Sequence, residues 1–597
     1  MNFFKVVLAS AIGYIIAGII LLTLLIVTVV GIASSSSGQE ELPSDAVLTL
    51  KLNYPIVDRV QDGNPLAALA LLNPNEQSPL GLNDILSSID KAKTDNNIKG
   101  IILDLTTFEA GYAKLTEVRN KLEEFKATGK FIYAYADYYY FPTYFMASVA
   151  DSVFVNPEGE MAFNGMVAQV TFFAGALEKL GVNMQVVRAG KFKGAVEAYT
   201  RNNLSPENKE QIEIYINSVF NETLAKISKS RKIDVAKLKA DADELKMKSV
   251  NDFKSNGYID AVAYRDQFYS AMKKRMGVKD DHKVPLISEQ KYAKSLEDLG
   301  SGSDRVAVVY ASGDIIGGKG DGTQIAADDL AETLKNVRLD NKVKAVVLRI
   351  DSRGGSSLAS DIIWREAKLL SAAKPLIVSM SDVAASGGYY IATPARKIVA
   401  EPTTITGSIG VFGLIPNAQK LLNDKLGIEF EYVGTGKHSD IGRIDRDMTL
   451  EEREYIESII DKIYDTFLSR VAEGRKMTKE QVHEVAQGRV WTGVMAKEVG
   501  LVDELGGLEK AIEIAAKEAN ITEYKLKEYP KVKDQLELIV NKMSGNTSFQ
   551  SKVKEMAKYT GFESYAHYLS EFEKFGTKHS VQAIMPFDIS VKNYSLH

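Results

Sequence analysis

Residues 81–105 read GLNDILSSIDKAKTDNNIKGIILDL, and residues 326–350 read AADDLAETLKNVRLDNKVKAVVLRI. The two stretches align without a gap at an offset of 245 residues, and the alignment continues through residues 137 and 382. In each, a helical pattern leads into an unbroken apolar run, which is typical of a buried strand in a parallel sheet. A repeat of this length in a chain of 597 residues predicts two related domains.

Both copies continue with the same alternation of strands and helices. Apolar strands are expected in the first copy at Ala46–Leu52, Gly100–Leu105 and Phe131–Ala136, and in the second at Val306–Tyr310, Ala345–Ile350 and Leu376–Met380. The alternation predicts an α/β fold with a parallel sheet in each copy, covered by helices on both faces.

The repeat also sets the expected domain bounds. The first repeat is expected over residues 46–300 and the second over residues 304–535, after a Gly-Ser junction. Residues 536–597 match neither copy and are expected to form a helical appendage, because aromatic residues recur there at Tyr559, Phe562, Tyr565, Tyr568 and Phe572.

Composition excludes several classes of function. The net charge of -5 provides no basic surface for nucleic acid. The chain has no cysteine, which rules out disulfides, thiolate zinc sites and a cysteine nucleophile. No pattern calls for a metal or a cofactor.

The N-terminus has the pattern of a membrane anchor. No charged residue lies between Lys5 and Glu40, and residues 6–33 are long enough to cross a hydrocarbon core of about 30 Å. We expect a retained transmembrane helix there; a cleaved signal peptide, whose apolar region has about 7–15 residues, is the alternative. The lysine before it and the acidic residues after it predict that residues 1–5 stay in the cytoplasm. After a linker at 34–45, the body would lie outside, which is the periplasm if the source is a didermal bacterium.

The two copies differ where chemistry is expected. In the second copy Ser386 follows a strand, precedes Gly387 and Gly388 and starts a helix, where the first copy has Phe141-Pro142-Thr143. A serine at this position is commonly a helix cap. The small residues around it leave space for a substrate, however, so Ser386 is a candidate nucleophile.

Paired glycines follow the preceding strand of the second copy. Gly354 and Gly355 stand where the first copy has Glu109-Ala110. Glycines in such a turn allow backbone N–H groups to point at a developing negative charge. Because parallel strands end at the same sheet edge, one of these amides and that of Gly387 can form an oxyanion hole; a plain tight turn is the alternative.

A serine nucleophile needs a base, and none of the six histidines stands in a recognisable triad setting. Lys193 follows an apolar strand of the first copy, and the second copy has Ser439 at that place, whereas Lys191 has a counterpart in Lys437. Burial can lower the pKa of a lysine until it acts as a base, although most lysines are solvated surface groups.

A third element is Ser408, within Thr406-Gly407-Ser408-Ile409-Gly410; before the same final glycine the first copy reads Ala162-Phe163-Asn164-Gly165, in which Asn164 has no hydroxyl to match. Its hydroxyl can hold the lysine amine by a hydrogen bond. A simple turn serine explains the residue equally well.

Together these segments resemble signal peptide peptidase A in its long tandem-repeat form, a membrane-anchored serine–lysine peptidase family of the ClpP/crotonase superfamily. The resemblance covers residues 46–535 and the anchor, and it is carried by four blocks: DVAASGGYY at 382–390, TGSIGVFG at 406–413, KGAVE at 193–197, and VWTG at 490–493 with GLVD at 500–503. It implies that Ser386 is the nucleophile, Lys193 the general base and Ser408 a neighbour of the lysine, and that Gly354 and Gly355 contribute to the oxyanion hole.

The resemblance also implies what the protein does. It implies a serine endopeptidase of the bacterial inner (cytoplasmic) membrane that degrades cleaved signal peptides, built from two ClpP/crotonase-like repeats and assembled as a homotetramer. The chain departs from the family at Asp351-Ser352-Arg353, where Asn-Ser-Pro is usual, and at Glu197-Ala198-Tyr199, where Glu-Pro-Phe is common. An inactive membrane scaffold and a crotonase-like acyl-transfer enzyme are the alternatives. The distribution of residues predicts one active site per chain, at the seam between the repeats.

Overall fold

The computed structural model describes residues 43–60, 79–105, 109–295, 302–530, 582–584 and 590–591, together with Gly13. The expected transmembrane segment at 6–33 therefore lies outside the described residues, apart from Gly13. Among the residues that are described, no helix has the length and apolarity needed to span a membrane. From Asp45 onward, all described residues belong to one compact unit.

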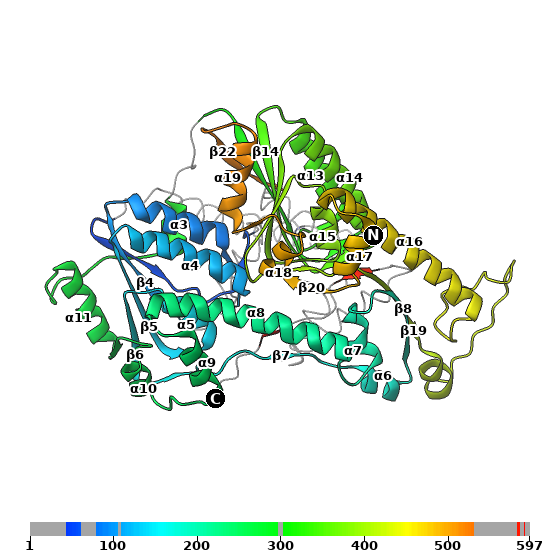
Figure 1. The fold of residues 1–597 in the computed structure, drawn as a ribbon, viewed down its shortest axis with the longest axis horizontal. Helices are drawn as coiled ribbons and strands as arrows, with labels where there is room; N and C mark the ends of the chain where they lie inside the picture. Colours follow the sequence, from blue (N-terminus) through cyan, green and yellow to red (C-terminus); the bar gives the residue numbers. More distant parts are fainter. Residues whose placement is uncertain are drawn as a thin grey trace, which may run out of the picture. The chain divides into compact units, whose positions relative to one another are not determined.

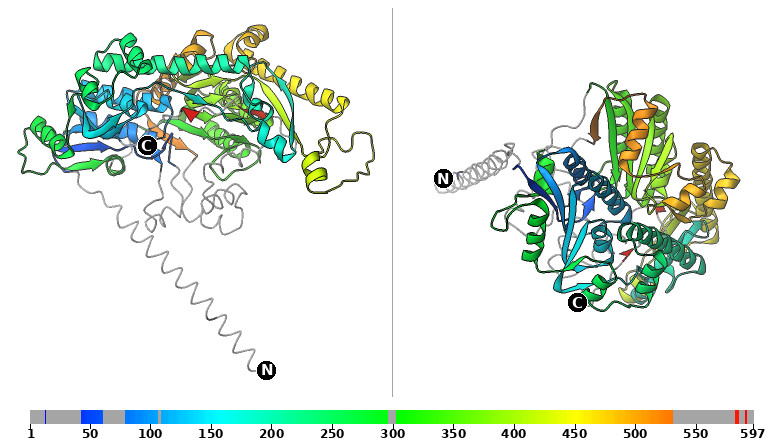
Figure 2. Two further views of the ribbon diagram at one scale, coloured as in Figure 1. Left: turned by 90° about the horizontal axis from the view of Figure 1, so that it is seen from below. Right: turned by 60° about the vertical axis from the view of Figure 1, so that its left-hand side comes forward.

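The first repeat is built on a parallel six-stranded sheet. Its strand order is β10 (Leu286–Ser288), β1 (Ala46–Leu50), β4 (Ile98–Asp104), β5 (Phe131–Tyr139), β6 (Ser152–Met161) and β9 (Ala261–Val262). One face packs on helix α11 (Arg265–Met276) through Phe268 and Met272. Its strands β1, β4, β5 and β6 are drawn in blue and cyan in Figure 2.

The second repeat contains the corresponding series of strands within an eight-stranded sheet. Its sheet runs β20 (Val490–Thr492), β18 (Ile405–Gly407), β16 (Leu376–Ala385), β14 (Val343–Ser352), β11 (Arg305–Ser312) and β22 (Lys525–Tyr529), with β17 (Lys397–Ala400) beside β16 and β21 (Glu504–Leu505) beside β17. All of its ladders are parallel except that between β18 and β20. The series β1, β4, β5, β6, β9 thus corresponds to β11, β14, β16, β17, β21. The prediction of two α/β copies with parallel sheets is confirmed.

Helices follow the repeat as well. Helix α3 (Leu82–Thr94) corresponds to α13 (Ala327–Leu339), and both its first and its last residue lie 245 positions before those of α13. The other matching pairs are α4 (Tyr112–Ala127) with α14 (Ser357–Ala373), α5 (Phe141–Ala147) with α15 (Gly387–Ala392), and α8 (Pro206–Arg231) with α16 (Leu450–Arg475). Two short strands, β2 (Ile56–Val57) and β3 (Leu80–Gly81), pair with each other. The other helices and helical turns are α6 (Ala174–Leu180), the 3₁₀ turn Gly194–Val196, α7 (Glu197–Thr200), α9 (Val235–Asp243), α10 (Val250–Ser255), α12 (Glu289–Lys294), the π-turn Lys420–Lys425, α17 (Lys479–Val485), α18 (Gly493–Glu498) and α19 (Leu508–Glu518).

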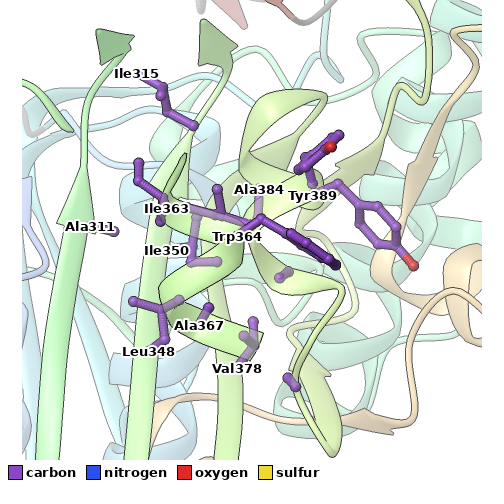
Figure 3. Close-up of a cluster of buried hydrophobic side chains, with 14 of the residues drawn as sticks. Ala311, Ile315, Leu348, Ile350, Ile363, Trp364, Ala367, Val378, Ala384 and Tyr389 are labelled. Carbon is purple, nitrogen blue, oxygen red and sulfur yellow. The ribbon is translucent and has the colours of Figure 1, made fainter. Parts of the chain in front are cut away.

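The core of the second repeat has two layers, because alternate residues of its strands face opposite sides of the sheet. Val346 and Leu348 of β14 pack with helices α13 to α16 on one face. Ala345 and Val347 pack against α19 on the other. Figure 3 shows Ala384 and Tyr389, which lie on either side of Ser386 in the sequence, within the first of these clusters. The segment that carries Ser386 is therefore anchored in the core.

A third sheet combines strands from both repeats. Its order is β13 (Ile325–Ala326), β12 (Ile315–Ile316), β15 (Gly354–Ser356), β23 (Gln582–Ile584), β19 (Val411–Asn417) and β8 (Asn183–Ala189). Strand β8 of the first repeat pairs antiparallel with β19 of the second over seven residues, from Val411 opposite Ala189 to Asn417 opposite Asn183. The two strands lie side by side in Figure 1. This ladder brings the loop after β8, which contains Lys193, into the second repeat.

A buried ion group also joins the repeats. Arg349 of β14 is 0% exposed, and its guanidinium lies 2.9 Å from Asp58 and 2.5 Å from Glu117, both of the first repeat. Breaking a buried pair by removing one partner costs about 3–5 kcal/mol, since the other charge stays buried. The group therefore fixes the two repeats against each other.

The segment at 536–597 differs from the expected helical appendage where it is described. Gln582–Ile584 forms β23, and Ser590–Val591 forms β24, which pairs with β7 (Ala168–Gln169). The aromatic positions at 559–572 lie outside the described residues. Both short strands exist through pairing with distant edges, which a local sequence pattern does not record.

Candidate active site

Ser386 stands at the junction of strand β16 and helix α15, completely buried. Its backbone has φ 57° and ψ -115°, a region that non-glycine residues rarely adopt. Its side chain accepts no bond from the helix N–H groups, so it does not act as the cap that its position suggests. The backbone is held by the Ser386 amide, which donates to Gly407 O at 2.8 Å. Strain of this kind persists only where the surroundings enforce it, and it concentrates at functional sites.

Lys193 meets Ser386 from the first repeat. Its Nζ lies 2.8 Å from Ser386 Oγ, and the side chain is 0% exposed. The loop that carries it is tied to the second repeat by Phe192, whose amide donates to Gln487 O at 2.9 Å. The structure thus brings together the two residues that the repeat comparison singled out.

Ser408 completes the surroundings of the amine. Lys193 Nζ lies 2.9 Å from Ser408 O and 2.9 Å from Ser408 Oγ. Ser408 is itself buried, with φ 51°. Both serines in contact with the amine therefore hold backbone conformations that are unfavourable for their residue type.

Burial lowers the pKa of Lys193 well below its usual value of 10.5. A neutral amine has two N–H donors and one lone pair. The carbonyl of Ser408 can only accept, so it takes one N–H, and Ser408 Oγ can take the other. The lone pair is then free to accept the hydroxyl proton of Ser386, which is the geometry of a nucleophile and its base.

Gly488, which was not predicted from the sequence, gives Lys193 its space. It has φ +80°, and a Cβ added to it would lie 2.7 Å from the backbone N and the Cβ of Lys193. Its amide donates to Ile409 O at 2.8 Å, next to Ser408. The only sequence signal is that Gly488 lies two residues before Val490, where the VWTG block begins.

Gly488→Ala is expected to lower kcat/KM by about 100-fold, since a displacement of about 1 Å in a catalytic group costs that much. Gly500→Ala is a matched control, because Gly500 also has φ +80° but has no atom within 4 Å of an added Cβ. The control variant introduces the same backbone strain, about 1–2 kcal/mol, without contacting Lys193. Its kcat/KM should therefore stay within about threefold of that of the parent. Equal activity of the two variants would show that Gly488 does not position Lys193.

The candidate oxyanion glycines lie beside Ser386. A Cβ added to Gly387 would stand 3.2 Å from Gly355 N and 3.2 Å from Gly354 Cα, so these backbones are in close contact. The amide of Gly354 already donates to Ser352 Oγ at 3.1 Å. Of the three predicted donors, Gly387 and Gly355 are therefore kept as candidates, although Gly355 also pairs with β12 and β23 in the ladders of β15. Gly387 lies in the first turn of α15, where N–H groups have no partner within the helix.

Lys114 holds the strand ends that carry these groups. Its Nζ lies 2.6 Å from Asp351, at the end of β14, and 2.8 Å from Asp382, in β16. Burial alone would lower the pKa of Lys114, but Asp351 and Asp382 raise it well above its usual range. Asp382 also accepts the amides of Gly111 and Ala113 at the start of α4, at 3.1 Å each. These contacts hold the first repeat to the second just before the Gly354–Gly355 turn and just before Ser386.

The comparison positions behave differently from Lys193. Lys191 is exposed, with its Nζ 5.0 Å from the centre of the Phe192 ring. Lys437 pairs with Glu451 at 2.6 Å on the surface, and the hydroxyl of the exposed Ser439 donates to Gly436 O at 2.9 Å. Among these four residues, Lys193 alone reaches the serine.

Comparisons with known proteins agree with the two-copy structure. The model of "Peptidase family S49" matches twice, at residues 124–279 and 368–522. "Serine protease SPPA, chloroplastic" from Arabidopsis thaliana is 36% identical over 487 residues, covering 80% of this chain and 69% of that protein. "Protease 4" from Salmonella typhi is 33% identical over 527 residues, covering 86% and 84%. The match to a solved ClpP1 mutant from Listeria monocytogenes covers 34% of this chain and 94% of that protein, at 18% identity and a TM-score of 0.24.

Proposed function

Because the chain belongs to peptidase family S49, we propose that it is a serine endopeptidase with a single Ser386–Lys193 dyad shared between its two repeats. The observation that carries this proposal is the 2.8 Å contact between Lys193 Nζ and Ser386 Oγ, made where both side chains are fully buried. Neither repeat contains both groups, so the proposal assigns one active site to each chain.

In the proposed reaction, neutral Lys193 accepts the proton of Ser386 as Oγ attacks a peptide carbonyl carbon. The carbonyl oxygen becomes an oxyanion, for which the amides of Gly355 and Gly387 are the proposed donors. The C–N bond then breaks, Lys193 returns the proton to the leaving amine, and the acyl group remains on Ser386. Water, deprotonated by Lys193, then attacks the ester carbon, the bond from that carbon to Oγ breaks, and Lys193 returns the proton to Ser386 Oγ as the second product leaves.

The surroundings of Lys193 support the role of base. A lysine with its usual pKa of 10.5 is protonated at neutral pH and has no lone pair to offer. Burial removes the solvation of the ammonium form, and Ser408 satisfies the two N–H groups of the neutral form. The same arrangement aims the remaining lone pair at Ser386.

We further propose that the enzyme is anchored in the inner membrane by residues 6–33 and degrades remnant signal peptides on the outer side of that membrane. The supporting features are the uncharged apolar segment and the lysine that precedes it. Two ClpP/crotonase-like repeats, at 46–300 and 304–535, and assembly as a homotetramer complete the proposal. Among the comparisons, the S49 matches fall one in each of these ranges.

The function is tested by incubating the purified full chain in detergent with two synthetic peptides of equal length, an apolar signal-peptide core and a polar sequence. Internal cleavage of the apolar peptide is expected, with kcat/KM at least about tenfold higher than for the polar one, because apolar contacts of a few methylenes supply that much discrimination. Mass spectrometry identifies the products. Binding of the apolar peptide without products would instead favour the inactive scaffold.

A further inference from the structure

Gln211 of helix α8 is a buried amide to which the proposed mechanism gives no role. It is 1% exposed, and it forms hydrogen bonds through both ends of the amide. Its Nε2 donates to Phe192 O at 2.9 Å and to Asn208 Oδ1, while its Oε1 accepts the amide of Val490 at 3.2 Å. A glutamine amide has two N–H donors, and both are engaged here. Because one end faces oxygen atoms and the other an N–H group, these partners fix the orientation of the amide.

One end of Gln211 supports the lysine loop, by which we mean the segment between β8 and α7. The Phe192 carbonyl that it holds belongs to the peptide bond leading into Lys193. Asn208, one turn earlier in the same helix, packs on the residue after the lysine, since a Cβ added to Gly194 would clash with the Asn208 side-chain amide. The start of α8 therefore supports the loop backbone on both sides of Lys193.

The other end of the amide bonds to the strand that holds both serines. Helix α8 passes beside β20 in Figure 1, and Val490 of β20 lies opposite Gly407 of β18. Gly407 O accepts the amide of Ser386 at 2.8 Å. The residue before Val490 is Arg489, whose carbonyl accepts the amide of Ser408 at 2.7 Å. A single side chain thus connects the lysine loop of the first repeat with the backbone that fixes both serines of the second.

We propose that Gln211 is a positioning residue for the dyad: its amide sets the separation between the lysine loop and β20, and so places Lys193 Nζ against Ser386 and Ser408. The lysine side chain is long, so the 2.8 Å contact of its amine with Ser386 Oγ depends on where its backbone is held. A displacement of about 1 Å in a catalytic group costs about 100-fold in rate. This inference rests on the proposed function, because the group that Gln211 places is the base of that reaction.

The connection through Gln211 also bears on the protonation of Lys193. Burial lowers the pKa of this lysine, and the groups that contact its amine, Ser386 Oγ with the carbonyl and hydroxyl of Ser408, are uncharged. A lysine loop released from Gln211 would admit water to the amine, which favours the ammonium form and raises the pKa. The pH at which activity rises therefore reports on this connection, whereas a loss of stability alone leaves that pH unchanged.

The test compares Gln211→Met with Ser218→Ala in the full chain, using an apolar peptide ester as substrate. Methionine is unbranched and of similar length, but it can neither donate to Phe192 O nor accept the amide of Val490 as an amide oxygen does. Ser218 lies two turns further along α8, and its hydroxyl is 3.1 Å from that of Thr492 in β20. Ser218→Ala therefore removes a different hydrogen bond between the same helix and the same strand, and it is the matched control.

Gln211→Met is expected to lower kcat by about 100-fold while KM stays within about twofold, because the base is displaced and no substrate contact is removed. The midpoint of its pH profile for kcat/KM should move to higher pH, so that part of the loss is recovered in alkaline solution. Ser218→Ala should keep kcat within about twofold of the parent and the parent's midpoint. A Gln211→Met variant with the kcat and the midpoint of Ser218→Ala would overturn the proposal.

Gln211→Glu is a second variant, which decides the matter if Gln211→Met does not fold. It keeps the shape of the side chain and an acceptor for Val490, but it replaces the donor to Phe192 with a carboxyl oxygen. Even above the pH midpoint, where Lys193 is neutral, its kcat should remain about tenfold below that of the parent, as expected for a displacement of less than 1 Å. A return to the parent's kcat at that pH would contradict the positioning role.

A measurement without substrate separates this inference from the proposed function. The unfolded chain keeps the lysine proton to about pH 10.4, so the stability of the parent relative to Lys193→Met rises with pH once the folded protein releases that proton. With Gln211→Met in both proteins, the rise should begin at higher pH. An onset that Gln211→Met does not move would overturn the positioning role. A moved onset in a protein whose peptide cleavage does not require Lys193 would overturn the proposed function and leave Gln211 as the residue that holds the lysine.

Discussion

Ser386→Ala is expected to lower kcat/KM for peptide cleavage by about 10,000-fold or more, because loss of a nucleophilic serine removes the covalent route entirely. The hydroxyl contributes little to stability, since it contacts Lys193 and does not cap helix α15. The variant should therefore fold normally, with an unchanged circular dichroism spectrum and a melting temperature within a few degrees of the parent.

The matched control for this change is Ser88→Ala. Ser88 is as buried as Ser386, in helix α3, and its hydroxyl has no hydrogen-bond partner. Ser88→Ala removes the same hydroxyl group from an equally buried position that is far from Ser386 in the sequence. Its kcat/KM should therefore stay close to that of the parent. A folded Ser386→Ala variant with activity near that of Ser88→Ala would show that another residue is the nucleophile.

Lys193→Met is expected to lower kcat/KM by about 1,000-fold or more, toward the upper end of what a general base contributes. Methionine keeps an unbranched apolar chain in a fully buried position but has no lone pair basic enough to accept the serine proton. Lys191→Met is the control, because Lys191 is exposed and lies two residues away. It should retain activity within about twofold, as surface changes distant from the chemistry usually do.

The pH dependence should identify Lys193 independently. In the proposed mechanism only the neutral amine is active, so kcat/KM should rise with pH through the lowered pKa of Lys193 and level off well below 10.5. Stability should respond in the same direction. In the unfolded chain the lysine keeps its proton up to about 10.4, whereas in the folded protein it releases the proton earlier. Across that interval the unfolded state binds more protons, so the parent gains stability with rising pH relative to Lys193→Met, by at most about 1.36 kcal/mol per pH unit. A stability difference that is independent of pH would indicate a lysine that stays charged.

Much of the fold could be predicted from the sequence because the chain contains two copies of one domain, which can be compared with each other. The repeated helix and apolar strand at residues 81–105 and 326–350 predicted two sheets, and the two sheets share one series of parallel strands. The differences between the copies then singled out Ser386 and Lys193, which the structure places 2.8 Å apart. Residues needed for packing are expected in both copies. A chemically reactive residue that occurs in one copy only is therefore a sign of function.

Other parts of the site could not be predicted, because they arise from contacts between distant elements. Gly488 matters through the backbone of Lys193, and Lys114 through Asp351 and Asp382 of the other repeat. No local pattern marks Lys114, and Gly488 is marked only by its place two residues before the VWTG block. Similarly, the amide of Gly354 donates a hydrogen bond to Ser352 Oγ and is therefore a weaker candidate for an oxyanion donor. The Gly-Gly sequence by itself does not show this contact.

The C-terminal strands show a further limit of local pattern. Aromatic spacing at 559–572 favours a helix, but the described residues beyond it are strands because open edges elsewhere in the fold accept them. Short strands are stabilised by their partners more than by their own sequence. A three-residue strand such as β23 is visible only once those partners are in place.

The most direct test of a single site built from both repeats is to trap the acyl-enzyme. A slowly hydrolysed apolar peptide ester is mixed with the full chain, the reaction is quenched in acid, and the acylated residue is located by peptide mass spectrometry. The acyl group is expected on Ser386 in the parent, and its formation should fall by about 1,000-fold in Lys193→Met, the effect of losing the base. An acyl group on any other residue, or undiminished acylation of Ser386 in Lys193→Met, would contradict the shared dyad.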